Sequence, residues 1–113
     1  MVDARSEAGL ELDTTQRIIE SLSNVCTRAV LFSLTGAPKD ATMVSDEAGI
    51  SLSTAYKSLS ILEELGLVEV SRFVISPEGK KVKQYRSRVS KVEITMEGPE
   101  PVLSLRPNAR LPE

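Results

Sequence analysis

The sequence contains no histidine, no tryptophan and a single cysteine, Cys26. Histidine is the commonest general base and the commonest metal ligand, so its absence removes most familiar catalytic arrangements. One thiol cannot form a disulfide within the chain; among apolar neighbours we expect Cys26 to act as a small buried hydrophobe, with redox sensing as the minor alternative. There is also no phosphate-binding loop and no nucleophile paired with a base. We therefore expect no enzymatic activity, no cofactor and no bound metal.

Long apolar runs are also missing. The stretches that exist are as short as Ala29 to Phe32, far below the roughly 18 residues that span a bilayer. The N-terminus carries acids where a secretory signal needs a basic start and an apolar segment. We therefore expect a cytoplasmic protein with no membrane association. What remains is 113 residues, 41% of them apolar and 27% charged, which is the composition of one soluble globular domain.

Charge is small in total and uneven along the chain. The formal net charge is −2. Residues 1–20 nevertheless hold five acids against two bases, whereas residues 80–91 hold six bases and no acid. A local basic segment can attract a polyanion even when the whole molecule is acidic. The alternative is a strand that lysines merely keep soluble.

Apolar residues at helical spacing predict four helices in residues 13–65. The first is expected to begin at Asp13, where Gln16 three residues later completes a capping box. A second, from Val25 to Leu34, follows a cap at Ser23-Asn24. It is apolar nearly all round, which indicates a central helix packed on several sides. The expected buried stripe of the first helix comprises Ile18, Ile19, Leu22, Val25 and Cys26.

The third and fourth helices are separated by a short turn. Asp40 is expected to cap a short helix that ends at Ala48, and Ser51 to cap a helix from Leu52 to Leu65. Two helices joined by about three residues, with Gly49 in the turn, form a helix-turn-helix. The expected core stripe of the fourth helix is Leu52, Ala55, Leu59 and Leu62.

After Gly66 the apolar period changes to two residues, which predicts strands. We expect a hairpin from strands 67–75 and 82–89 with a turn at 76–79, and a second hairpin from 91–96 and 102–105. The predicted fold class is α+β: a winged helix-turn-helix with a helical N-terminal part, a β-hairpin wing and a C-terminal β-hairpin extension. The expected divisions are an N-terminal arm at 1–12, disordered or docked on a partner through Leu10 and Leu12, a DNA-binding domain at 13–90, an extension at 91–106 and a tail at 107–113.

Three segments carry a family resemblance: Leu22-Ser23-Asn24 with Thr27-Arg28; Ala48-Gly49-Ile50-Ser51-Leu52-Ser53-Thr54-Ala55-Tyr56-Lys57 with Leu59; and Leu62-Glu63-Glu64-Leu65-Gly66-Leu67-Val68. Together they resemble winged helix-turn-helix regulators of the ArsR type, particularly small archaeal ones, over about residues 14–90. The resemblance implies a homodimer that binds double-stranded DNA. Metal-sensing members carry paired cysteines in the third helix, which this sequence lacks, so we expect no metal sensing. Members often end in a dimerising helix, whereas 91–106 indicate strands; we look for the dimer contact in the first helix, the arm and the second hairpin.

The fourth helix and the wing supply the predicted DNA contacts. A helix fits the major groove with its N-terminal half toward the bases, and an adjacent hairpin reaches a phosphate track or the minor groove. The alternative interpretation of the same helix face is an ordinary solvated surface. The predicted DNA-binding residues are Ser51, Ser53, Thr54, Tyr56, Lys57 and Ser60 of the helix, and Lys80, Lys81, Lys83 and Arg86 of the wing.

The sequence therefore predicts a dimeric, sequence-specific DNA-binding transcriptional regulator. A winged-helix protein-assembly module of the transcription machinery, with no direct reading of DNA, is the alternative that the acidic total charge favours. Further basic residues have two interpretations each. Arg28 and Lys39 are phosphate contacts or, for Arg28, one half of a surface ion pair; Arg86 and Arg88 contact phosphate or pair with Glu69 or Glu93 across the sheet.

Overall fold

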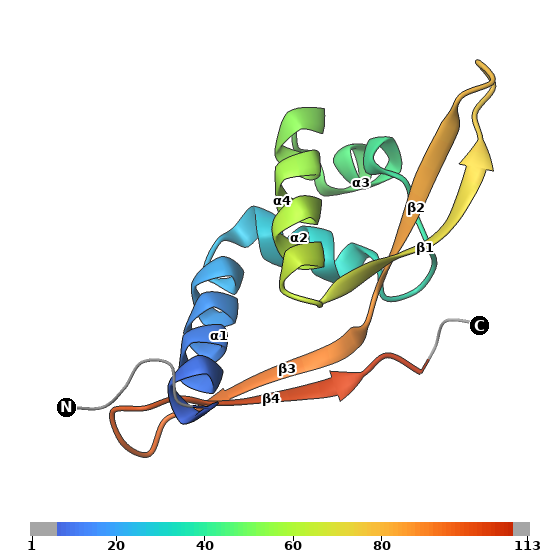
Figure 1. The fold of residues 1–113 in the computed structure, drawn as a ribbon. Coiled ribbons are helices and arrows are strands. Elements are labelled where there is room, and N and C mark those ends of the chain that lie inside the picture. Colours follow the sequence, from blue (N-terminus) through green and yellow to red (C-terminus); the bar gives the residue numbers. More distant parts are fainter. Residues whose placement is uncertain (1–6, 110–113) are drawn as a thin grey trace.

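A computed structural model describes residues 7–109, and these form four helices followed by two β-hairpins (Figure 1). The α+β winged helix-turn-helix predicted from the sequence is confirmed, including the C-terminal hairpin. The elements are α1 (Glu7–Leu22), α2 (Val25–Ser33), α3 (Ala41–Ala48), α4 (Leu52–Glu64), β1 (Val68–Ile75), β2 (Lys81–Ser87), β3 (Val89–Thr95) and β4 (Val102–Pro107).

Helix α1 begins earlier than the capping signal indicated. The expected start at Asp13 is wrong, because the helix already runs from Glu7 and the predicted arm overlaps it. The remainder of the arm, 1–6, and the end of the tail, 110–113, lie outside the described residues. Ile18 and Leu22 are buried as expected. Val25 is not part of the α1 stripe, since it opens α2 and is 66% exposed.

The caps of the next two helices are as predicted. The Asn24 side chain accepts from the Cys26 and Thr27 N–H groups at 2.8 and 3.2 Å, and Asp40 accepts from the Met43 N–H at 2.9 Å. Such caps satisfy backbone donors that have no partner inside the helix. The α2 helix is central, but it is not packed against the protein on every side, since Phe32 on its outer side is 40% exposed.

Helix α4 is held at both ends by local signals. Ser51 caps its start by accepting from the Thr54 N–H at 3.1 Å. At its end Gly66 has φ +77°, and the Leu67 N–H returns to the Leu62 carbonyl at 2.9 Å, which is a Schellman motif. The buried stripe differs from the expected one in two positions. Leu52 is 44% exposed, and Ser58 is buried in its place.

The wing is an antiparallel pair of β1 and β2. Its register pairs Val68 with Ser87 and Phe73 with Lys83, with a bulge between Val70 and Arg72. The other edge of β2 meets the segment before α3, where Lys39 and Tyr85 exchange backbone hydrogen bonds of 3.0 and 2.8 Å. This bridge fixes the base of the wing against the helices.

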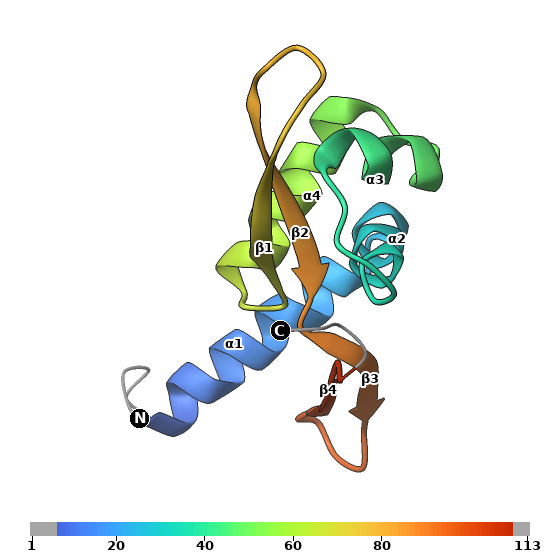
Figure 2. The ribbon, with the colours of Figure 1, turned by 90° about the vertical axis from the view of Figure 1, so that its right-hand side faces the viewer.

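The second hairpin begins two residues earlier than expected. The predicted return strand through 89 is interrupted, because the chain leaves the first sheet after Ser87 and starts β3 at Val89. The buried Ser87 hydroxyl donates to the Val89 carbonyl at 2.6 Å. Asn108 secures the same end of the hairpin from the side of β4, because its side chain donates to the carbonyls of Thr35 and Ser87 at 3.1 Å each. The wing and the second hairpin leave the body in opposite directions (Figure 2).

The core lies where α2, α3 and α4 meet the bases of both hairpins. In residues 7–109 there is no helix both long and apolar enough to cross a membrane. The fully buried large side chains are Val30, Leu31, Leu34, Val44, Leu59, Leu62, Leu67 and Val68.

Candidate nucleic-acid interface

The outward face of α4 is exposed and polar. The helix is anchored by Ala55, Ser58, Leu59 and Leu62, so the residues between these project into solvent. Tyr56 is 54% exposed, and its hydroxyl lies toward α3. The four predicted contact residues on this open surface are Ser53, Tyr56, Lys57 and Ser60.

Ser51 and Thr54 are engaged with each other. The Ser51 hydroxyl donates to the Thr54 Oγ1 at 2.8 Å while accepting from the Thr54 backbone N–H. Their hydroxyls therefore hold the first turn of α4, and the predicted DNA contacts at these two positions stay untested.

The wing presents one face to α4. Because β-strand side chains alternate, Lys81 and Lys83 lie on the same side as Tyr85, whose ring is buried against the helices. Phe73 is opposite Lys83 in the register and belongs to this face. The Lys81 Nζ lies 4.6 Å from the centre of the Phe73 ring, a cation–π contact that orients the amine along the wing.

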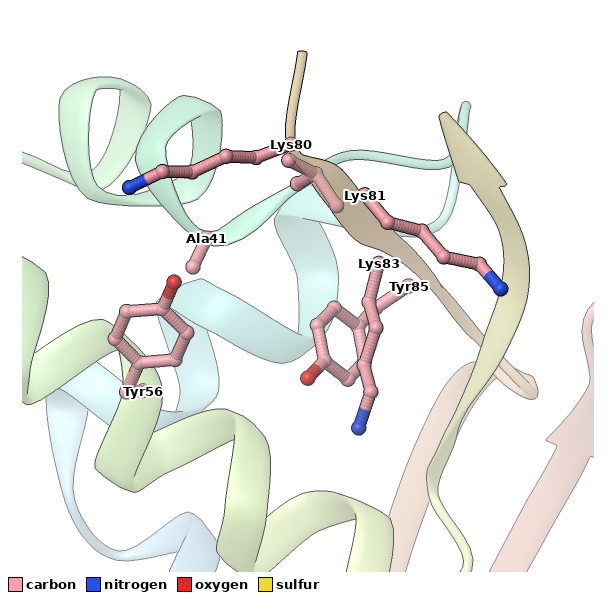
Figure 3. Close-up of a pocket in the computed structure, with 7 residues that line it drawn as sticks. Ala41, Tyr56, Lys80, Lys81, Lys83 and Tyr85 are labelled. Carbon is pink, nitrogen blue, oxygen red and sulfur yellow. The ribbon is translucent and has the colours of Figure 1, made fainter. Parts of the chain in front are cut away.

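A cleft of about 490 Å³ separates this wing face from the helices. Figure 3 shows Lys80 extending toward the helices, Lys81 toward β1, and Lys83 alongside Tyr85. Three lysines therefore line one cleft together with two tyrosine side chains, although the Lys81 amine itself points toward β1. Its lining comprises Ala41, Tyr56, Lys80, Lys81, Val82, Lys83 and Tyr85.

Tyr85 forms the floor of this cleft in its neutral form. Burial raises the pKa of the Tyr85 hydroxyl above 10.0, and the negative charge of Glu63 adds to the rise. The phenol therefore adds no negative charge to the cleft at neutral pH.

Arg86 lies on the other face of the wing. Its Nε donates to Glu69 Oε2 at 2.6 Å, and Arg88 Nε lies 3.9 Å from Glu69 Oε1. The cross-strand pairing that the sequence offered as an alternative is thus present. The structure does not bring Arg86 together with the lysines of the cleft.

Arg28 and Lys39 have structural partners. The Arg28 guanidinium donates to the carbonyls of Leu22 and Ser23 at 2.8 and 3.1 Å, so it caps the end of α1. Among the described residues it forms no salt bridge, and the phosphate contact at Arg28 stays a prediction. The Lys39 amine donates to the Ser33 carbonyl at 2.6 Å and to Glu47 at 2.7 Å. It joins the end of α2 to α3 and is mostly buried.

Acidic residues mark the far end of α4. Glu64 pairs with Arg17 of α1 at 3.0 Å, and Glu63 precedes it on the same turn. The N-terminal half of α4 carries Lys57 and lies nearest the lysines of the wing. A polyanion is therefore attracted to the N-terminal half of the helix and repelled from its end.

Cys26 is half-buried rather than fully buried as expected. It lies in a small pocket near the start of α2 with Thr54, Lys57 and Ile61. Within the described part of the chain, no three acidic or cysteine side chains are grouped so that they could hold a metal.

Two residues of the interface were missed by sequence reasoning. Phe73 and Tyr85 were counted only as strand residues. Strand alternation for Tyr85 and the hairpin register for Phe73 could have placed both on the face that carries Lys81 and Lys83. Which face of the wing turns to α4, however, depends on contacts distant in sequence, such as the Lys39–Tyr85 bridge.

A helix-turn-helix followed directly by a β-hairpin is the arrangement of the winged helix-turn-helix fold. The chain matches no protein-family model, and no curated protein resembles it closely enough to count as a match. Among solved structures it is similar to a domain from Mycobacterium bovis, described as a homodimeric winged helix-turn-helix DNA-binding domain of a possible ArsR-family transcriptional regulator. The two are 24% identical over 76% of this chain and 75% of that chain, with a TM-score of 0.59. This likeness shows the fold.

Proposed function

We propose that the protein is a homodimeric transcriptional regulator that binds double-stranded DNA, with α4 in the major groove and the wing on the backbone. The observation that carries the proposal is the continuity of two surfaces: the exposed polar face of α4 and the cleft that holds Lys80, Lys81 and Lys83. Major grooves are about 12 Å wide and admit a helix, and the adjoining phosphates need nearby cations.

Individual roles follow from position. Lys57 projects from the second turn of α4, where it reaches a phosphate or a guanine edge, and Tyr56 offers a hydroxyl to phosphate or a ring to a thymine methyl. Lys80 and Lys83 neutralise phosphate at the cleft. Arg86, which is held by Glu69, contributes through the general field of the wing rather than by direct contact.

Dimerisation is supported by two considerations. The similar domain from Mycobacterium bovis is described as homodimeric. A single helix reads only a few base pairs, whereas a two-fold dimer reads two half-sites about one helical turn apart. We therefore expect the DNA site to be an inverted repeat. We also expect the protein to act in the cytoplasm.

Selection of bound duplexes from a random pool tests the proposal. We expect an inverted-repeat consensus, and we expect Lys57→Ala to weaken binding to that duplex about tenfold or more by fluorescence anisotropy. Arg72→Ala, which removes the same charge from the face of the wing opposite to the cleft, serves as the control and should leave affinity nearly unchanged. Recovery of no consensus, together with no saturable binding at physiological salt, would contradict the proposal.

Such a result would instead favour a protein-assembly module of the transcription machinery. The observation for this second function is the acidic total charge of −2, which leaves the basic wing face as a local site for an acidic partner.

A further inference from the structure

The first turn of α4 exposes a large apolar side chain. Leu52 is the first residue of the helix, and 44% of it is exposed. Its helical spacing from Ala55 and Leu59 is that of the buried stripe, yet those two residues are buried and Leu52 is not. Side chains lean toward the N-terminus of a helix, so the Leu52 side chain projects past the start of α4. Leu52 therefore offers apolar surface at the end of the helix that is expected to enter a groove.

The hydroxyl groups of the same turn are bonded to one another. The Ser51 hydroxyl donates to the Thr54 Oγ1 at 2.8 Å, and its oxygen accepts from the Thr54 backbone N–H at 3.1 Å. The Ser53 Oγ lies 3.2 Å from the same Ser51 oxygen. A hydrogen bond from these groups to a base would compete with the bonds that cap the helix. Burial of the exposed Leu52 surface carries no such cost, because it breaks no hydrogen bond.

The apolar surface continues to the next turn at Tyr56. Residues four apart lie one above the other on a helix, and Tyr56 is 54% exposed. Tyr56 lines the cleft on the wing side together with Lys80, whereas Lys57 lines a small pocket on the α2 side. An object that covers Leu52 and Tyr56 therefore has a lysine on either side. This arrangement suits an apolar group that lies between two anionic tracks.

We infer that Leu52 recognises thymine by burying its 5-methyl group in the major groove. On the base edges of that groove the thymine methyl is the apolar group, and it lies between the two phosphate backbones. A recognition helix brings its N-terminal residues to those edges. Cytosine has no methyl group at this position, so it leaves Leu52 without a partner. This inference rests on the proposed function and assigns one base to one side chain.

The consensus duplex with uracil in place of single thymines tests the contact, since uracil lacks only the methyl group. Burial of one such group changes affinity about fourfold. By fluorescence anisotropy, wild type should lose about fourfold at one thymine of a half-site. Leu52→Ala should bind the thymine and uracil duplexes equally at that position, whereas Leu52→Met keeps an apolar side chain and should keep the loss. Circular dichroism melting verifies that each variant folds.

Leu105→Ala is the matched control. Leu105 is also a leucine, is 38% exposed and lies on β4, in the hairpin that Figures 1 and 2 place at the other end of the molecule from the start of α4. This variant should show the same loss with uracil as wild type. If wild type loses no affinity with uracil at any position, or if Leu52→Ala keeps the loss, the inference is overturned while DNA binding stands. If wild type binds no duplex, the proposed function fails and the inference fails with it.

Discussion

Lys39 shows how a basic side chain in a winged helix-turn-helix fold can be held by contacts within the protein. Its amine is bonded to the Ser33 carbonyl and to Glu47, and only 17% of the side chain is exposed. Its backbone also holds β2 at Tyr85. One residue thus joins α2, α3 and the wing, so its removal should affect stability rather than DNA affinity.

We expect Lys39→Ala to lower the free energy of unfolding by about 1–2 kcal/mol, since it leaves a helix-end carbonyl and a carboxylate without their charged donor. Urea denaturation measures the change. Lys80→Ala is the control, because Lys80 is exposed at the cleft, and it should change stability by less than about 0.5 kcal/mol. Equal stability of the two variants would show that the Lys39 bridge contributes nothing.

Tyr85 should make the free energy of unfolding depend on pH in the alkaline range. Its pKa is raised from 10.0 by burial, so above pH 10.0 the unfolded chain releases the phenolic proton while the folded chain keeps it. The folded state then binds more protons, and stability falls as pH rises from 10.0 toward the raised pKa. Thermal melts of wild type and Tyr85→Phe measure the effect. Above pH 10.0 we expect the melting temperature of the wild type to fall relative to that of Tyr85→Phe. A difference in melting temperature that stays constant with pH would refute this.

Individual contact residues were only partly predictable. Side chains on α4 follow from helical phase, so Ser53, Tyr56 and Lys57 were placed outward correctly. The sequence predicts Arg86 as a DNA contact together with the wing lysines, because all of these residues are basic and lie close together in the sequence. Its salt bridge to Glu69 depends on strand register, which the bulge between Val70 and Arg72 sets. The sequence does not show that bulge.

At the scale of elements, capping explains why the helix boundaries were largely predictable. Asn24, Asp40 and Ser51 bond to backbone groups two or three residues away, so the signal is local. The start of α1 was missed for the complementary reason. The capping box of Asp13 and Gln16 allows a helix to begin there but does not stop a helix that began earlier. The preceding residues include good helix formers, and the helix extends back to Glu7.

The junction of α4 with the wing depends on Gly66. Its φ of +77° lies in the left-handed region, where a Cβ costs about 1–2 kcal/mol. We expect Gly66→Ala to lower the free energy of unfolding by that amount in urea denaturation. Gly36→Ala is the control, because Gly36 lacks a positive φ and a Cβ there would meet no atom within 4 Å. Equal losses from the two substitutions would contradict the assignment of strain to Gly66.

For the whole molecule, the segregation of charge matters more than its total. The wing cleft gathers Lys80, Lys81 and Lys83, while acids gather at the end of α4 and in the loop of the second hairpin. A duplex bound at the cleft therefore meets a positive surface on a molecule of net charge −2. Composition alone could not give this result, because it averages regions that the fold separates.

The two faces of the wing should differ in the salt dependence of DNA binding. Lys83 faces the cleft, whereas Arg72, one register position away, faces outward and donates to Gln84 at 2.7 Å. Each phosphate contact that is lost reduces the slope of log affinity against log salt by about 1. We expect Lys83→Ala to produce this reduction and Arg72→Ala to leave the slope close to that of the wild type, although both remove one positive charge. Anisotropy titrations of the consensus duplex at graded salt measure both slopes. If the two variants lower the slope equally, the wing attracts DNA through its overall field and the cleft is not a phosphate site.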